Sequence, residues 1–164
     1  MDEQLEGRPL GASASQLTEL ALPNDANILG TLFGGKVMSM VDLAGSLAAV
    51  RHSRLPVVTA SIDHMNFLQP VSIGELVILR SSVNRVFRTS MEVGVKVWVE
   101  NVHTGECKHT SSAYLTFVAL GEDGKPKQIT PGIPNSEEEL RRYEEAGERR
   151  RYRLEQRDRA KKQW

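Results

Sequence analysis

The stretch Asn27-Ile-Leu-Gly-Thr-Leu-Phe-Gly-Gly-Lys-Val-Met-Ser-Met-Val-Asp42 leads from a loop into a helix that is apolar on nearly every side. From Val37 to Val50, every residue is apolar, small or hydroxylic except Asp42. This composition is typical of a helix in the interior of a domain. A carboxylate buried there without a partner would be strongly destabilising, so Asp42 must be hydrogen-bonded or take part in chemistry.

The pair Gly34-Gly35 lets the backbone turn tightly into this helix. The first amides of a helix lack partners within it and carry the positive end of the helix dipole. Free amides at Gly34, Gly35 and Lys36 would suit a phosphate, a carboxylate or the oxyanion of a reacting acyl group. Close packing of the loop explains the glycine pair equally well. Asp42 favours the functional interpretation, because the dipole stabilises it little two turns inside the helix.

A carboxylate two turns from an oxyanion site can reach a water molecule or a carbonyl carbon held there. Asp42 is therefore a candidate general base or nucleophile for acyl chemistry. Asn27, in the preceding loop, could orient the water, although asparagine more often serves as a turn residue.

The composition narrows the classes of function. A chain of 164 residues suits one domain, and 21 basic against 21 acidic residues give no bulk charge that would attract nucleic acid or an anionic membrane. Cys107 is the only cysteine, so we expect a buried thiol in a reducing compartment. No signal peptide or apolar stretch of about 20 residues is evident, and we expect a soluble, cytoplasmic protein with no membrane partner.

Metal and serine chemistry are not indicated. The four histidines lack the spacing of metal ligands, so we expect no metal site and no cofactor; they are His52, His64, His103 and His109. We expect His52 to be favoured as a cation by the dipole at the end of its helix. No serine lies in a Gly-x-Ser-x-Gly context.

Arginine and hydroxyl side chains gather at a break between two predicted strands: Arg85, Arg88, Thr89 and Ser90. Such groups can bind phosphate, but a solvent-exposed hairpin commonly carries the same residues. The cluster from Arg149 to Arg153 has the same ambiguity.

Periodicity predicts an α+β domain. The helix should run from Gly34 to about His52, because Pro56 cannot continue it. Strands are predicted over residues 16–22, 57–67, 74–87, 89–100 and 106–120. Short connections make the last four strands an antiparallel meander, with the helix across one face of the sheet. Residues 1–13 read as a flexible arm, with order beginning near Ser15.

The region 123–164 reads as a loop followed by a charged helix. Ser136 and Glu139 form a capping-box signature. Four acidic and basic pairs are spaced i,i+4: Glu137 with Arg141, Glu138 with Arg142, Glu145 with Arg149, and Glu155 with Arg159. Because apolar residues are few, we expect a solvated appendage, weakly interrupted at Gly147, whose charges pair along their own helix.

Four motifs follow one another along the chain: Asn27-x-x-Gly-x-Leu-Phe-Gly-Gly-x-x-Met-x-x-x-Asp42, Val58-Thr-Ala-Ser-Ile-Asp-His-Met-Asn-Phe67, Gln69-Pro-Val with Gly74, and Arg88-Thr-Ser-Met-Glu-Val93. Over about residues 15–120 the chain resembles the hotdog-fold acyl-CoA thioesterases of the cytosolic acyl-CoA hydrolase type. The resemblance implies a hotdog domain over residues 14–122, in which a five-stranded antiparallel sheet wraps a long central helix, followed by the charged helical extension.

The resemblance also implies hydrolysis of fatty acyl-CoA to free fatty acid and coenzyme A, with coenzyme A as part of the substrate rather than a cofactor. It makes Asp42 the base or nucleophile, brings Asn27 from a partner subunit, and uses the Gly35 amide to polarise the thioester carbonyl. Further substrate contacts are expected at Gly34, Asn66, Phe67, Arg88, Thr89 and Ser90. Active sites would then lie at a dimer interface, commonly within a trimer of dimers.

Two other functions stay open at this point. A hotdog dehydratase would need a histidine at the N-terminal end of the helix, around Gly34-Gly35, which we call the helix mouth. The sequence has no histidine between Asn27 and Asp42. A non-catalytic acyl-CoA-binding protein would not need Asp42.

Overall fold

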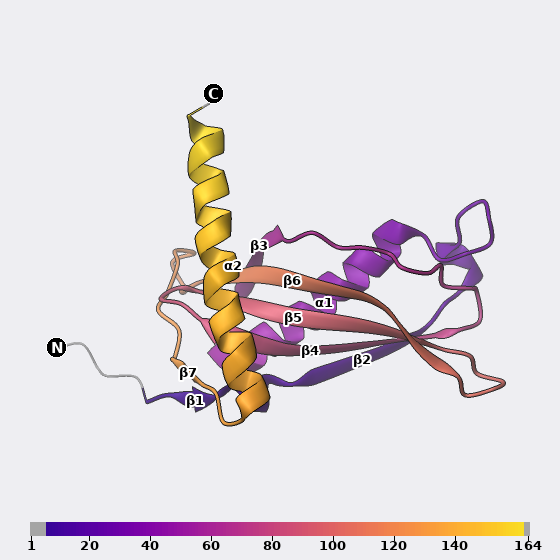
Figure 1. Ribbon diagram of the computed structural model, residues 1–164, viewed down its shortest axis with the longest axis horizontal. Helices are drawn as coiled ribbons and strands as arrows, with labels where there is room; N and C mark the ends of the chain where they lie inside the picture. The colour runs from indigo at the N-terminus through magenta and orange to yellow at the C-terminus, as the bar shows by residue number, and fades with distance from the viewer. Residues whose placement is uncertain (1–5, 163–164) are drawn as a thin grey trace.

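The computed structural model describes residues 6–162. Its elements along the chain are β1 (Arg8–Pro9), a 3-10 turn (Leu10–Ser13), β2 (Ser15–Leu20), a second 3-10 turn (Pro23–Asp25), α1 (Gly34–Ser53), β3 (Val57–Ile62), β4 (Leu76–Val86), β5 (Ser90–Glu100), β6 (Cys107–Ala119), β7 (Gly132–Ile133) and α2 (Glu137–Lys161). Five strands form an antiparallel sheet in the order β2-β4-β5-β6-β3. α1 lies along one face of this sheet and α2 crosses the other face (Figure 1). The predicted α+β class and the central helix are confirmed.

The buried side of α1 packs on the inward-facing residues of the sheet. Its contact residues are all apolar: Val37, Met40, Val41, Ala44 and Ala48. At Gly45 a side chain would meet the Phe117 ring at 3.0 Å, so glycine allows the helix to lie close to the sheet. α1 ends where Arg54 adopts a left-handed conformation, with φ of 57°, two residues before Pro56.

The opposite side of α1 is not covered by the chain. Met38, Leu43 and Leu47 are between 38% and 47% exposed, so the expectation that α1 is buried all round is wrong for a single chain. The sheet can cover only one side of a helix that lies flat on it. The adjacent strand β3 is an edge strand, and its Val58 is 46% exposed.

The predicted meander is correct for β4, β5 and β6 and wrong for β3. β3 pairs with β6 at the far edge of the sheet rather than with β4. The connection over residues 63–75 is long enough to carry the chain across the sheet, so the inference from short connections did not apply. The strand also ends at Ile62, and residues 63–67 are irregular rather than part of a strand reaching Phe67.

The segment expected to be a flexible arm is packed from Arg8 onward, while residues 1–5 lie outside the described residues. Arg8–Pro9 forms a short parallel pair with Gly132–Ile133. Leu10 is buried in the main core, and a side chain at Gly132 would collide with it. Order therefore begins well before Ser15. An isolated leucine carries no periodic signal from which this packing could be predicted.

His52 is buried near the end of α1, close to the same N-terminal segment. Its Nε2 lies 2.9 Å from the carbonyl oxygen of Thr130, and the Arg8 guanidinium donates to the His52 carbonyl oxygen. Burial lowers the pKa of His52 and the Arg8 charge adds to this effect, while the hydrogen bond to Thr130 opposes it. His52 is therefore a neutral hydrogen-bonding residue, and not the cation expected from the helix dipole.

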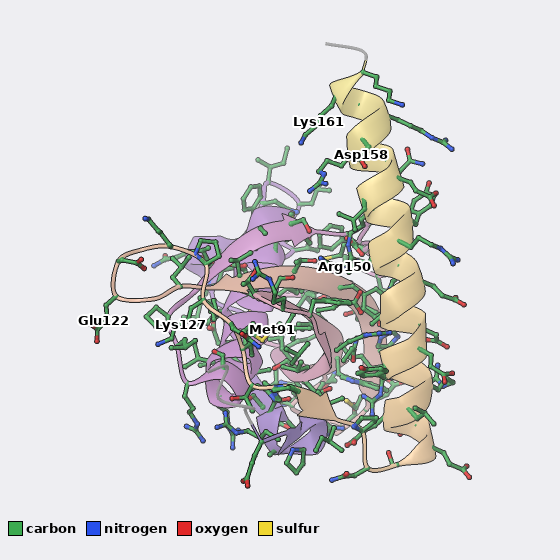
Figure 2. All side chains as sticks on the ribbon, turned by 90° about the vertical axis from the view of Figure 1, so that its left-hand side faces the viewer. Met91, Glu122, Lys127, Arg150, Asp158 and Lys161 are labelled. Atoms are coloured by element: carbon green, nitrogen blue, oxygen red, sulfur yellow. The ribbon has the colours of Figure 1, made fainter. Side chains whose placement is uncertain are left out.

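α2 begins at the predicted Ser136 cap and is not a solvated appendage. The Glu139 carboxylate accepts from the Asn135 amide at 2.7 Å rather than from that of Ser136, so only half of the predicted capping box forms. The Glu139 amide donates to Ser136 Oγ at 3.1 Å. Side chains on the inner side of α2 reach toward the sheet, with Arg150 among them, whereas Asp158 and Lys161 lie farther along the helix (Figure 2). Among the described helices, none combines the length and apolar character needed to cross a lipid bilayer.

The inner side of α2 covers a buried carboxylate on the outer face of β5. Glu92 is 0% exposed and accepts hydrogen bonds from Arg149 Nη2 at 2.7 Å and from Asn84 Nδ2 at 3.1 Å. Burial would lower the pKa of Arg149, but the hydrogen bonds and charge of Glu92 outweigh it and raise that pKa. The predicted pairs Glu138 with Arg142 and Glu145 with Arg149 form, but Arg149 pairs with the sheet as well.

We expect the free energy of unfolding to fall as the pH drops from about 7.5 to about 5.5, by at most about 1.4 kcal/mol per pH unit from His52. The folded-state pKa of His52 lies below 6.5, so the unfolded chain takes up the proton first and acid favours unfolding. Urea unfolding at fixed protein concentration should show that His52→Gln flattens this dependence. The exposed His64, changed to Gln, is the matched control, and an unchanged slope in His52→Gln would contradict the assignment.

Candidate active site

The N-terminus of α1 presents two unpaired backbone amides. Phe33 precedes the helix in an extended conformation and supplies no side-chain cap. The amides of Gly34 and Gly35 make no hydrogen bond to residues 6–162, whereas the Lys36 amide donates to the Phe33 carbonyl at 2.9 Å. Two of the three amides expected to be free are thus available for an anionic group, and the third is not.

The loop before α1 is tied to the rest of the domain. The Phe33 amide donates to the Asp25 carbonyl and the Leu32 amide to the Val71 carbonyl, each at 2.8 Å. Lys36 Nζ lies 3.3 Å from Glu19 and 3.7 Å from Asp25. The direction of the free amides is therefore set by the fold, which is what a preorganised oxyanion site requires.

Asn27 organises this loop. Its Oδ1 accepts from the amides of Leu29 and Thr31 at 2.9 and 3.2 Å, and its Nδ2 donates to Thr31 Oγ1 at 2.8 Å. These contacts match the turn role that asparagine often has. No hydrogen bond joins Asn27 to Asp42 within the described chain, and one hydrogen of the Nδ2 group is not needed by the loop.

Asp42 lies on the uncovered side of α1 and is half-exposed rather than buried. Its Oδ1 accepts a 2.5 Å hydrogen bond from Thr59 Oγ1, on the edge strand β3. Thr59 was not singled out from the sequence. Thr59 could have been found as a hydroxyl residue on the face of the strand that is turned toward the helix.

Phe67 is the predicted site residue that the structure brings to the helix mouth. Its ring lies 3.9 Å from the position that a Cβ of Gly34 would occupy. Phe67 and the neighbouring Asn66 are both exposed. A large apolar side chain at this position can line the path of an acyl group.

Arg88, Thr89 and Ser90 lie at the opposite end of the sheet. They form the turn between β4 and β5, near the C-terminal end of α1, while Gly34 is at the other end of that helix (Figure 1). The Thr89 carbonyl accepts from Ala119 and the Arg88 carbonyl from Ile129, so the turn is tied down by its backbone. A single chain does not bring these residues to the helix mouth.

An arginine of α2 joins this second group. Arg150 Nη1 lies 3.2 Å from Ser90 Oγ, and its guanidinium stacks 4.2 Å from the Phe87 ring centre. Burial lowers the pKa of Arg150, and repulsion from Arg153, Arg157 and Arg85 adds to that effect. One arginine of the α2 cluster therefore contacts Ser90 of the cluster between the strands.

Potential metal ligands are scattered over the described residues, and the single thiol lies at the surface. Within residues 6–162, no three His, Cys, Asp or Glu side chains are grouped as metal ligands would be. Cys107 is exposed at the start of β6, so the expected buried thiol is wrong. It lies at the strand end, where the side chain points into solvent.

Comparisons with known proteins agree on one class. The model of the thioesterase superfamily matches residues 29–106. A Bacillus subtilis (strain 168) protein named uncharacterized acyl-CoA thioester hydrolase is 43% identical over 132 residues, which cover 80% of this chain and 77% of that protein. The mouse protein named acyl-coenzyme A thioesterase 11 is 39% identical over 85% of this chain, which corresponds to 23% of its own length.

Solved structures extend the likeness to the whole fold. The crystal structure of an apo-hexameric acyl-CoA thioesterase superposes with a TM-score of 0.88 at 41% identity, covering 93% of this chain and 97% of that one. An acyl-CoA hydrolase from Staphylococcus aureus, solved with butyryl coenzyme A, coenzyme A and coenzyme A disulfide, has a TM-score of 0.87 at 31% identity, with 95% of each chain covered. The same hydrolase has also been solved as alanine variants of an asparagine, an aspartate and a threonine.

Proposed function

Because the chain belongs to the acyl-CoA thioester hydrolases of the thioesterase superfamily, we propose that it cleaves fatty acyl-CoA to a free fatty acid and coenzyme A. The observation that carries the proposal is the pair of unpaired amides at Gly34 and Gly35, followed by Asp42 on the same helix. The sheet that wraps α1 is the hotdog fold.

The chemistry follows from charge at the helix mouth. A thioester carbonyl oxygen placed against the Gly35 amide is polarised, and the oxyanion that forms on attack is stabilised by the amide and the helix dipole. Asp42 either takes a proton from an attacking water or attacks the carbonyl carbon itself. In both routes the carbon–sulfur bond breaks and coenzyme A leaves as the thiol. In the first route water adds directly to the acyl carbon; in the second, water cleaves the anhydride formed between the acyl group and Asp42, which releases the fatty acid and restores the carboxylate. Thr59 holds one oxygen of Asp42 and leaves the other for the reaction.

Two copies of the chain complete the site in this proposal. Gly35 and Asp42 of one chain are separated by about 10 Å along the helix, too far for both to act on one carbonyl group, contrary to the expectation from the sequence. The Gly35 amide of one copy would therefore act together with Asp42 of the other copy. The uncovered side of α1, with Asp42 on it, and the free edge of β3 together form a surface that a second copy would bury. The remaining Nδ2 hydrogen of the partner's Asn27 could then orient the water. A trimer of such dimers would match the hexameric relatives.

The Staphylococcus aureus variants support these roles. The altered asparagine, aspartate and threonine have numbers one higher than Asn27, Asp42 and Thr59, so the three spacings are the same in both chains. Those three side chains are the ones that the structure places in the loop before α1, on its open side and on the strand beside it.

The test of the proposed function is the release of free thiol from acyl-CoA substrates of short, medium and long chain length. We expect release without added metal, unaffected by a chelator, and a kcat at least about 100-fold lower in Asp42→Ala. That variant should stay folded, because the Asp42 side chain makes a single hydrogen bond to the described chain, with Thr59. Binding of acyl-CoA without thiol release would indicate a binding protein instead. If Asp42→Ala and Asp42→Asn both unfold, Asp42 is structural.

We expect complementation between two inactive variants, Asn27→Ala and Asp42→Ala. After subunit exchange, about a quarter of wild-type activity should return, because half of the dimers are mixed and each carries one intact site of two. Asn27→Asp keeps the acceptor that orders the loop while removing the amide donor, so it is the better-folded substitute. Exchange without recovery would place Asn27 and Asp42 of one chain in the same site.

For the phosphates of coenzyme A we propose the group of Arg88, Thr89 and Ser90, together with Arg150. Coenzyme A carries its phosphates far from the thioester, so a phosphate site remote from Gly34 is compatible with the reaction. Arg150 has no carboxylate partner in the described residues and has three arginines near it, so a bound anion would relieve that repulsion.

We expect Arg88→Ala to raise KM for acyl-CoA about five-fold with little change in kcat, as when uniform binding is lost far from the reacting carbon. Steady-state kinetics with Arg150→Ala should likewise show a raised KM with little change in kcat. Arg142→Ala is the matched control on α2, because within residues 6–162 the ion-pair partner of Arg142 is Glu138 of the same helix and not a residue of the sheet. An unchanged KM in Arg88→Ala, with a raised KM in the control, would move the phosphates elsewhere.

A further inference from the structure

Arg153 on α2 joins two carboxylates of the sheet. Its Nη1 lies 2.7 Å from Asp63 Oδ2 and 3.1 Å from Glu92 Oε2. Glu92 already has Arg149 and Asn84 as partners, so its charge is compensated without Arg153. Asp63 has no other ion-pair partner among the described residues. The contact that only Arg153 supplies is therefore the one to Asp63.

Asp63 is the first residue of the irregular segment that passes the helix mouth. Its amide donates to the Tyr114 carbonyl at 2.8 Å, and the Leu68 amide donates to the Thr110 carbonyl at 3.1 Å. Between these anchors, the backbone of residues 64–67 makes no hydrogen bond to the described part of the chain. Phe67, whose ring lies against Gly34, is thus placed by a short span whose backbone is hydrogen-bonded only at its two ends and whose Met65 side chain packs against the core.

We propose that Arg153 is a positioning residue for the active site, and that it acts through Asp63. The guanidinium fixes the Asp63 end of the span to the buried Glu92, and the span in turn fixes Phe67 beside the Gly34 mouth. α2 then sets the geometry of the acyl path from the far side of the sheet. This inference rests on the proposed thioesterase function, and it gives the C-terminal helix a role in that function.

The contacts of Arg149 and Arg153 distinguish the positioning role of Arg153 from the packing of α2 on the sheet. Arg149 binds Glu92 through Nε and Nη2, stacks 3.7 Å from the Tyr114 ring and does not touch Asp63. Arg149 holds the helix on the sheet, whereas Arg153 also reaches the segment that frames the site. Both guanidiniums lie on one helix and share Glu92, so they can be compared directly.

The experiment measures kcat, KM and amide exchange in Arg153→Ala, Arg153→Lys, Asp63→Asn and Arg149→Ala. We expect kcat/KM to fall about tenfold in Arg153→Ala, because a shift of the mouth by a fraction of an ångström disturbs alignment of the thioester. Amide exchange in the peptide containing residues 63–68 should become about tenfold faster at the same time. Arg153→Lys should recover part of both losses, and Asp63→Asn combined with Arg153→Ala should be no worse than either alone.

Arg149→Ala is the control for loss of docking, compared at a temperature where every variant is fully folded. It should lower the melting temperature at least as much as Arg153→Ala while leaving kcat/KM closer to that of the unaltered protein. An equal loss of kcat/KM in Arg149→Ala, or no loss in Asp63→Asn, would overturn the positioning role. If the unaltered protein releases no thiol, the proposed function fails, and amide exchange still decides whether Arg153 holds residues 63–68.

Discussion

The architecture depends on a twenty-residue apolar helix that can bury only one of its sides against a single sheet. Val41, Ala44 and Ala48 are removed from water by the sheet, and Gly45 lets the two approach closely. Leu43 and Leu47, on the other side, stay exposed in one chain. Burial of apolar area is the main favourable term in folding and association, so burying the uncovered side of α1 would favour association with a second chain.

The same division of α1 into a covered and an uncovered side determines where the carboxylate proposed to react lies. Asp42 is on the uncovered side, half-exposed and held by one hydrogen bond from Thr59, so its charge need not be compensated inside the domain. A carboxylate in the covered side would have required partners that lock it in place. The carboxylate proposed to react therefore lies where a second chain can complete its surroundings.

On the outer face of the sheet, in contrast, a carboxylate is fully buried and ion-paired within the chain. Glu92 is fully buried beneath α2 and is surrounded by donors from Arg149, Arg153 and Asn84. Such a network adds less stability than an apolar contact of equal area, but it specifies which part of α2 meets which strand. Through Asp63 it also reaches the segment beside Gly34, which links the two faces of the sheet.

The sequence by itself determined the elements and the candidate chemistry, because helical and strand periods, the Ser136 cap and the Gly34-Gly35 mouth are local properties of the chain. Only the tertiary structure decided that β3 pairs with β6, that Leu10 belongs to the core, that His52 is neutral and that Glu92 is buried. An alternating strand shows which residues point outward, but not whether a distant helix covers them. Burial and pairing depend on contacts between residues far apart in the chain, and these contacts leave no period in the sequence.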